Sequence, residues 1–331
     1  MTTATPITRT GSMVPEPSAL PDVLPTDRLN ARGMPTASWR GDLRKIPNAR
    51  NVVAVLATWG WSFGVMIGAA AINTWWSYLA GFVLLARGHV CLSILAHEAA
   101  HRLLFSNRAV NDFVGRWGLG YPALIPTMAY RRSHFAHHRD ELGPEEPDLA
   151  LYAGYPIARD SWHRKLRRDI TGVSGAKVIK GLFRAARSGS IEARQIIAVQ
   201  LVILGVSIVF MRPLAYVIWI GSWITLWRVS NRLRAIAEHG GMVRSKDRRM
   251  TTHVIRQTWI ARFWFVPYNT GWHLAHHADM GVPWTKLPRL HDELVRSGWV
   301  TEDIVYPSYW AFWRTVSSRP PVTSDTPTPP G

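Results

Sequence analysis

The stretch NVVAVLATWGWSFGVMIGAAAINTWWSYLAGFVLLA, residues 51–86, contains no Asp, Glu, Lys or Arg. A transmembrane helix needs about 20 apolar residues, so this stretch is too long for one span and long enough for two. A polar break at Asn73 divides it. We therefore expect membrane spans near residues 51–71 and 75–96, joined as a helical hairpin.

A second apolar window has the same form. Between residues 195 and 227 the only charged side chain is Arg212, which is followed by Pro213. Proline is tolerated in the first turn of a helix but kinks or breaks a helix interior, so Pro213 marks the division between two spans. We expect these spans near residues 195–211 and 213–231. Two hairpins would return every segment outside them to the same side of the membrane.

The distribution of charge supports this topology. The chain has 39 Lys and Arg against 22 Asp and Glu, a net charge of +17. The basic residues crowd the stretches 28–50, 131–194 and 228–262, whereas the turns near Asn73 and Arg212 carry almost none. This is the positive-inside pattern, which predicts that both termini are cytoplasmic. Such a charge is also typical of nucleic-acid binding, but here the cations flank apolar windows, so we expect no nucleic-acid partner.

Composition suggests the domain limits. Residues 1–40 begin with a Pro-, Thr- and Ser-rich segment that lacks the apolar core of a secretory signal, and we expect a disordered tail there. A membrane domain would cover residues 41–315, and residues 316–331 would form a second disordered tail. Cys91 is the single cysteine, so no disulfide can form within the chain.

Nine of the 13 histidines fall in the motifs HEAAH, HFAHH and HLAHH or in the short segment AEHG. Residues three and four apart share one face of a helix, and neutral imidazole is the commonest metal ligand in proteins. Adjacent histidines in an HxxHH motif can also serve two neighbouring ions. The pattern therefore predicts more than one metal ion. The nine candidate ligands are His97, His101, His134, His137, His138, His239, His273, His276 and His277.

These motifs resemble the three histidine boxes of the membrane fatty acid desaturase and hydroxylase superfamily. The run YNTGWHLAHHADMGVPWTKLPRLHDEL, residues 268–294, is similar to its third box, and AEHG resembles the extra histidine at the end of its last span. The resemblance covers roughly residues 50–300. It implies an all-α integral membrane fold, in which four transmembrane helices lie under a cytoplasmic helical cap. It also implies two iron ions held by the nine histidines.

The same resemblance implies a chemistry. The enzyme would use O2 and two external electrons to introduce a double bond into a fatty acyl or related lipid chain, presented as a lipid or an acyl thioester. A hydroxylase of the same superfamily is the nearest alternative. Breaking an unactivated C–H bond needs a redox metal, which zinc is not. The chain has no haem-binding HPGG motif and no ferredoxin-like cysteine cluster. We therefore expect a separate electron donor, either ferredoxin-like or a b-type cytochrome with its reductase.

Five further polar residues lie in or near the boxes: Glu98, Asp148, Glu238, Asn269 and Asp279. Carboxylates commonly accept a hydrogen bond from metal-bound histidines and so orient them. Asn269 could bond a metal-bound water. Each of these side chains is equally compatible with a solvated surface position.

Two other functions fit part of the pattern. HEAAH also matches the HExxH motif of zinc metalloproteases, in which the glutamate activates water. That interpretation leaves both HxxHH motifs unexplained. A histidine-rich metal transporter or storage protein is the second alternative, but transporters place their ionisable ligands within the spans rather than just beyond them.

Overall fold

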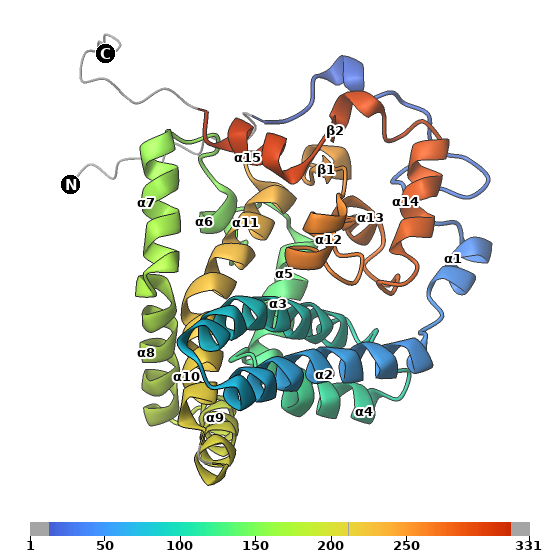
Figure 1. Ribbon diagram of the computed structural model, residues 1–331. Helices are drawn as coiled ribbons and strands as arrows, with labels where there is room; N and C mark the ends of the chain where they lie inside the picture. Colours follow the sequence, from blue (N-terminus) through green and yellow to red (C-terminus); the bar gives the residue numbers. More distant parts are fainter. Residues whose placement is uncertain (1–12, 211, 319–331) are drawn as a thin grey trace.

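The structure, a computed structural model, describes residues 13–210 and 212–318 and is mostly helical (Figure 1). Its α-helices are α1 (Ala37–Leu43), α2 (Asn48–Ile72), α3 (Trp75–Ala100), α4 (Arg108–Phe113), α5 (Thr127–Arg139), α6 (Leu149–Tyr152), α7 (Arg159–Ile170), α8 (Val173–Arg187), α9 (Ile191–Val209), α10 (Pro213–Ser222), α11 (Arg228–His239), α12 (Trp259–Trp264), α13 (His273–Ala278), α14 (Leu287–Arg296) and α15 (Tyr309–Val316). Short 3-10 turns are η1 (Pro17–Ala19), η4 (Arg248–Met250) and η5 (Glu302–Ile304), and π-helical turns are η2 (Val114–Gly120) and η3 (Trp223–Trp227). Strands β1 (Val254–Ile255) and β2 (Val305–Tyr306) form one short parallel pair.

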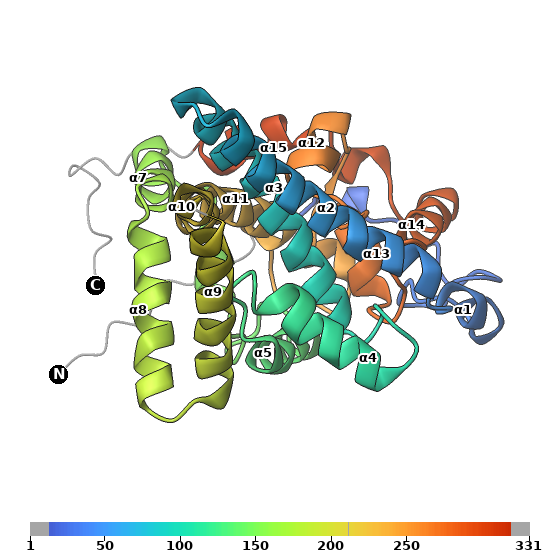
Figure 2. The same cartoon turned by 60° about the horizontal axis from the view of Figure 1, so that its bottom comes forward.

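Helices α2 and α3 form the first predicted hairpin and pack against each other along most of their length (Figure 2). Asn73, between them, adopts a left-handed conformation with φ of 53°, and Thr74 caps α3. Glycines let the two helices approach closely. A Cβ at Gly81 would lie 3.1 Å from the Cβ of Ala69, and a Cβ at Gly88 would lie 2.7 Å from a serine hydroxyl of α2. Small residues at helix contacts are typical of membrane bundles.

Three described helices are long and apolar enough to cross a membrane, namely α2, α3 and α9. The fourth predicted span, residues 213–231, lies in a helical run that continues from α10 through η3 into α11. The π-helical turn interrupts its α-helical geometry, and Arg228 begins the polar half of the run. α10 alone has only 10 residues. The fourth span therefore remains a prediction.

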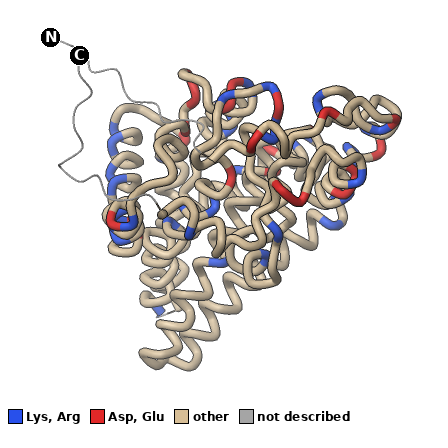
Figure 3. The backbone as a smooth tube through the Cα atoms, turned by 90° about the horizontal axis from the view of Figure 1, so that it is seen from above, with Lys and Arg blue, Asp and Glu red and all other residues tan. Residues whose placement is uncertain are grey.

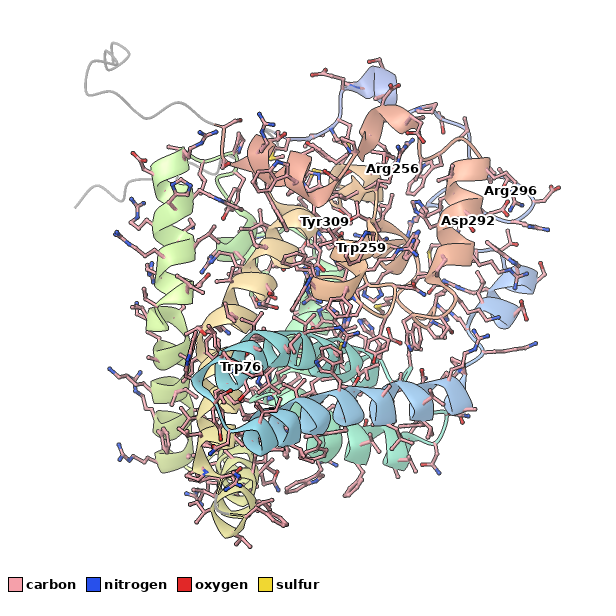
Figure 4. The ribbon with its side chains drawn as sticks, in the orientation of Figure 1. Trp76, Arg256, Trp259, Asp292, Arg296 and Tyr309 are labelled. Atoms are coloured by element: carbon pink, nitrogen blue, oxygen red, sulfur yellow. The ribbon has the colours of Figure 1, made fainter. Side chains whose placement is uncertain are left out.

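The charged residues are segregated in space. Lys, Arg, Asp and Glu gather over one part of the molecule, while the helices that extend furthest from it are almost free of them (Figure 3). Large exposed apolar side chains, among them Leu56, Ile67 and Val209, line α2 and α9. Trp76 lies at the start of α3, far from Arg256 and Arg296 (Figure 4). This separation is what a membrane-embedded stem under a polar cap requires.

The N-terminal segment differs from the expected disordered tail over residues 1–40. Residues 1–12 lie outside the described part of the chain. From residue 13 onward the segment packs on the cap: Met13 donates a backbone hydrogen bond to Gly241, and Leu29 is fully buried. Leu29 and Trp39 join a core with Leu274 of α13. The apolar contacts are spaced too widely to produce a periodic pattern, which explains why the polar composition dominated the prediction.

The C-terminal boundary also shifts slightly. Helix α15 ends at Val316, which is fully buried, and the Val316 carbonyl accepts a hydrogen bond of 2.8 Å from the amide of Ile157. The expected tail over residues 316–331 therefore begins with ordered residues. Its part from residue 319 onward lies outside the described residues.

Candidate metal centre

The nine histidines predicted as ligands come together from four helices. They lie at or just beyond the ends of α3, α5 and α11 and along α13, and these helices converge near the middle of the molecule (Figure 1). Each of the nine is buried, with at most 9% of its surface exposed. Segments up to 180 residues apart in sequence thus share one polar interior, as two membrane hairpins predict.

The rings divide into two sets. Five of them have ring nitrogens within 4.8 Å of one another, and we call these the first histidine group: His97, His101, His134, His138 and His276. At its centre, Nε2 of His134 lies 2.9 Å from Nε2 of His97, 2.9 Å from Nε2 of His101 and 3.1 Å from Nε2 of His138. Nε2 of His276 is 3.1 Å from Nε2 of His138.

The remaining four rings form the second histidine group: His137, His239, His273 and His277. His137, His239 and His277 form a cluster that could hold a metal ion. Nε2 of His273 lies 3.1 Å from Nε2 of His239 and 3.0 Å from Nε2 of His277, which adds a fourth nitrogen donor.

The two HxxHH motifs are used reciprocally. HFAHH contributes His134 and His138, which are four residues apart, to the first group and its middle histidine to the second. HLAHH contributes His273 and His277 to the second group and its middle histidine to the first. Neighbouring helical residues point about 100° apart, so one turn of helix can face two ions. Each motif therefore borders both groups.

The spacing of the nitrogens fits metal binding and does not fit hydrogen bonding alone. A neutral imidazole carries one N–H, so His134 cannot bond three other ring nitrogens at once. Two nitrogens about 2.1 Å from a common metal ion and about 90° apart lie about 3.0 Å from each other. Burial also favours the neutral, metal-binding form, because desolvation lowers the pKa of six of the rings well below its ordinary value: His134, His138, His239, His273, His276 and His277.

Two glutamates that the sequence analysis did not select hold rings of the second group. Nδ1 of His137 lies 2.6 Å from a carboxylate oxygen of Glu146, and Nδ1 of His277 lies 2.5 Å from one of Glu141. Burial is the largest single effect on His137 and lowers its pKa, but the hydrogen bond to Glu146 and the negative charges of Glu146, Glu141 and Asp148 together outweigh it, so the pKa is raised overall. Such bonds fix the ring orientation and direct Nε2 toward the metal.

A carbonyl and an arginine complete this support. Nδ1 of His239 donates a 2.7 Å hydrogen bond to the backbone carbonyl of Thr251. The Thr251 hydroxyl donates in turn to Glu141 at 2.6 Å, and Arg248 pairs with the same carboxylate at 2.6 Å. Glu141 is therefore the centre of a buried network that supports two rings of the second group, those of His239 and His277. Its one sequence signal is its place just after the second box, in RDELGPEEPD.

The first group has a different kind of support, and it centres on Arg131 of α5. This guanidinium is 8% exposed and donates to the carbonyls of Ala100 at 2.9 Å and Ala99 at 2.8 Å, at the C-terminal end of α3. It also pairs with Asp112 at 2.6 Å. A cation at a helix C-terminus satisfies unpaired carbonyls and the negative end of the helix dipole. Arg131 thus joins the helices that carry the first and second boxes.

Of the predicted supporting residues, two border the histidines. The carboxylate of Glu238 lies 3.6 Å from Nδ1 of His273, too far for a hydrogen bond, and 3.7 Å from the guanidinium of Arg234. Asp148 lines a cavity beside the rings, and its side chain makes no capping bond to α6. Neither makes a hydrogen bond to a ring nitrogen within the described chain.

The other three contact different parts of the cap. Glu98 accepts from the amide of Trp284 at 3.4 Å, and Asn269 donates to the Trp284 carbonyl at 3.1 Å. Asp279 binds Arg40 at 2.9 Å as well as a second arginine near α1. Among the residues that the structure describes, none of the three bonds a histidine. Of the two partners of Asp279, Arg40 is the last residue of the segment that the sequence analysis expected to be disordered, and Arg44 lies just beyond it.

Comparison with known proteins agrees with this site. The family model of fatty acid desaturases matches residues 73–310, which include all nine histidines. One curated relative, the dihydrorhizobitoxine desaturase of Bradyrhizobium elkanii, is 25% identical over 231 residues, which are 63% of this chain and 65% of that protein. This chain therefore matches slightly less than two thirds of the relative's length.

The family match covers well over half of the chain and spans the apolar helices α3 and α9 together with both histidine groups. Two of the buried histidines that could hold metal, His97 and His101, lie at the cytoplasm-predicted end of α3, a helix long and apolar enough to cross a membrane. This protein belongs to the fatty acid desaturase family.

Proposed function

We propose that this protein is a membrane-bound, iron-dependent desaturase. It removes one hydrogen from each of two adjacent saturated carbons of its substrate and leaves a double bond. Dioxygen accepts these two hydrogens together with two electrons and two protons from outside, and two waters are formed. The observation that carries the proposal is the arrangement of nine buried histidines in two groups with facing Nε2 atoms.

Each histidine group would hold one iron ion, and the pair would supply the redox chemistry with O2 that an unactivated C–H bond requires. The chain's own residues position the site. Glu141 and Glu146 hold two rings through Nδ1, and Arg131 fixes the helix ends that carry the first group. Burial of all nine rings excludes bulk water.

Five histidines in one group argue against the zinc protease. Structural and catalytic zinc sites use three or four protein ligands, and the first group alone exceeds that number. Glu98 is directed to the amide of Trp284. Replacing Glu98 with Gln would abolish a protease, whereas a desaturase should retain most of its activity. Replacing His137 with Ala should abolish the desaturase alone.

Metal analysis followed by product analysis tests the function. We expect about two irons per chain in protein purified from iron-replete cells. Extracts of expressing cells should contain a product that has lost two hydrogens, while a hydroxylase would add one oxygen. Acyl chains are the substrate that the family name favours, whereas the named relative from Bradyrhizobium elkanii is a dihydrorhizobitoxine desaturase. One zinc per chain without iron would overturn the proposal.

We further propose that electrons enter from an acidic carrier protein. A cavity of about 620 Å³ reaches His138 and His277 from the surface, and basic side chains surround it. Arg139, Arg244 and Lys246 are exposed at its rim. Opposite charge on a partner would speed docking and place its cofactor near the metal ligands. Replacing Arg244 and Lys246 with Glu should raise the KM for the carrier several-fold, and high salt should mimic that change. Unchanged kinetics would contradict this docking site.

We also propose that both termini and the histidines face the cytoplasm. The basic stretches flank the apolar helices on the side that carries the cap, whereas residues near Asn73 carry almost no positive charge. Labelling single cysteines introduced at residue 73 and in the 244–246 loop tests this sidedness. Only the first should react with an impermeant reagent added outside intact cells.

A further inference from the structure

A cavity of about 150 Å³ lies directly beside both histidine groups. His97 and His134 line it from the first group, and His137, His239 and His273 line it from the second. Its other walls come from α5, α6 and α11. A substrate of the proposed reaction would have to bring its reacting carbons close to both histidine groups, and residues of both groups line this cavity.

The walls opposite the histidines are charged. Arg234 and Glu238 project from α11, with side chains only 17% and 13% exposed, and Asp148 faces them from the start of α6. Asn231, Tyr130 and Tyr152 add polar atoms to the same lining. A cavity meant for plain methylene groups would have apolar walls.

These charged groups do not satisfy one another. Arg234 and Glu238 are 3.7 Å apart, which is beyond hydrogen-bond distance, and one carboxylate oxygen of Glu238 is buried without a hydrogen-bond partner among the described residues. The carboxylate of Asp148 has no hydrogen bond or ion pair within the described chain. Arg234 makes one long hydrogen bond, of 3.4 Å, to Asn231. Filling the cavity with a hydrocarbon chain would desolvate the Arg234–Glu238 ion pair without supplying its missing hydrogen bonds and would leave Asp148 unpaired within the described chain, which opposes binding.

We infer that the substrate is a small amino-acid-like zwitterion rather than a long acyl chain. Its carboxylate would pair with the guanidinium of Arg234, and its ammonium would pair with Asp148 and Glu238. A short saturated side chain would then extend along the histidines. The inference rests on the proposed desaturase function and specifies its substrate class. The volume agrees, because about 150 Å³ is well below the roughly 300–1,000 Å³ of sites for drug-sized ligands.

The reaction on such a molecule leaves both charged groups unchanged. Two adjacent methylenes of the side chain each lose one hydrogen and become a carbon–carbon double bond. One O2 takes up those hydrogens with two electrons from the external carrier and two protons from water, giving two waters. Pairing at both ends of the amino acid fixes which carbons reach the metal ligands.

Calorimetric binding to the iron-loaded full chain in lipid nanodiscs tests the inference. The probes are L-norleucine, pentylamine, which lacks its carboxylate, and hexanoate, which lacks its ammonium. We expect norleucine to bind at least 10-fold more tightly than either. Arg234→Gln should remove its advantage over pentylamine, and Asp148→Asn should reduce its advantage over hexanoate. Arg168→Gln and Asp160→Asn, at exposed positions, are the matched controls.

The outcomes separate this inference from the proposed function. Equal binding of the three probes, or no binding of norleucine, overturns the zwitterion site, even where phospholipid acyl chains are desaturated. Charge-dependent binding without any oxidation supports the site and contradicts the desaturase. Loss of iron in both variants would show that the charges serve the metal centre and would also overturn the inference. Should Arg234→Gln fail to fold, Arg234→Lys keeps the charge and should retain the preference over pentylamine.

Discussion

The two histidine groups are built from the same motifs but are held in different ways. In the second group, His137, His239 and His277 each direct Nδ1 to a carboxylate or a carbonyl. Nδ1 of His276 in the first group has no hydrogen-bond partner among the described residues, as is also true of Nδ1 of His273 in the second. The clearest support of the first group is the bond of Arg131 to the end of α3. Ring orientation thus depends on side-chain hydrogen bonds in one group and on helix packing in the other.

This difference separates two ways of losing a metal. A change in a supporting carboxylate should act on the second group and leave the helices in place. A change at the contact of α3 with α5 should displace whole ligands of the first group. The following substitutions test whether the two groups can lose metal independently. Removal of a ring should be equally damaging in either group, whereas each of the other substitutions should act mainly on one group.

The largest effect should come from removing a ring. We expect His276→Ala in the first group and His277→Ala in the second each to lower activity by more than about 100-fold, because even changes behind a ligand cost 10- to 100-fold. Iron per chain and turnover measure the result. A variant that keeps two irons and normal turnover would show that the ring is no ligand.

Arg131→Gln should have the next largest effect. It leaves the carbonyls of Ala99 and Ala100 and the carboxylate of Asp112 without their charged donor, and each such bond contributes about 1.5–3 kcal/mol. We expect a lower Tm and a preferential loss of one iron. Arg132→Gln, one residue further and exposed, is the control. Equal behaviour of the two variants would refute the importance of this contact.

Glu146→Gln should weaken the second group alone. The amide oxygen still accepts from Nδ1 of His137 but no longer carries a charge, so we expect metal affinity to fall about 10- to 100-fold with little change in Tm. Chelator titration followed by iron analysis measures this loss. Glu145→Gln is exposed and should behave as wild type. Loss of both irons at the same chelator concentration would argue against separate support.

The smallest effect concerns acid stability at the first group. The hydrogen bond from Arg131 holds the pKa of Asp112 below its ordinary value. Stability from this pair is therefore present above about pH 4 and is lost as the pH falls through the lowered pKa. The Tm difference between wild type and Asp112→Asn should be constant from pH 5 to 8 and shrink below pH 4. A difference that grows with acidity would contradict this sign.

The sequence predicted which histidines would cluster far better than it predicted the groups that support them. Side chains that share one face of a helix recur every three or four residues, so HFAHH and HLAHH can be recognised from the sequence alone. The structure brings all nine histidines together. The groups behind the rings follow no such period. Asp148 was expected to orient a histidine, yet Glu146, two residues earlier, makes the bond because of how the loop after α5 turns. Arg131 looks like any basic residue of a helix until its partners on α3 are known.

The fold shows the same limit. Charge-free windows predicted α2, α3 and α9 within a few residues, because burial in lipid demands long apolar runs. The π-helical turn Trp223–Trp227 has no comparable signal, and it divides the run in which the fourth span was expected. The order of residues 13–40 was also missed. This order depends on a few side chains, such as Leu29, that meet a surface formed by residues about 250 positions away.

The reciprocal use of the two HxxHH motifs has a consequence for assembly. An ion bound in either group orders helical turns that also carry ligands of the other, since HFAHH and HLAHH each border both. The second ion then meets a site whose conformational entropy has already been reduced. Filling of the two positions should therefore be cooperative. In wild-type protein short of iron, fully loaded and empty molecules would outnumber half-loaded ones, whereas a substitution that weakens one group, such as Glu146→Gln, should let half-loaded molecules accumulate.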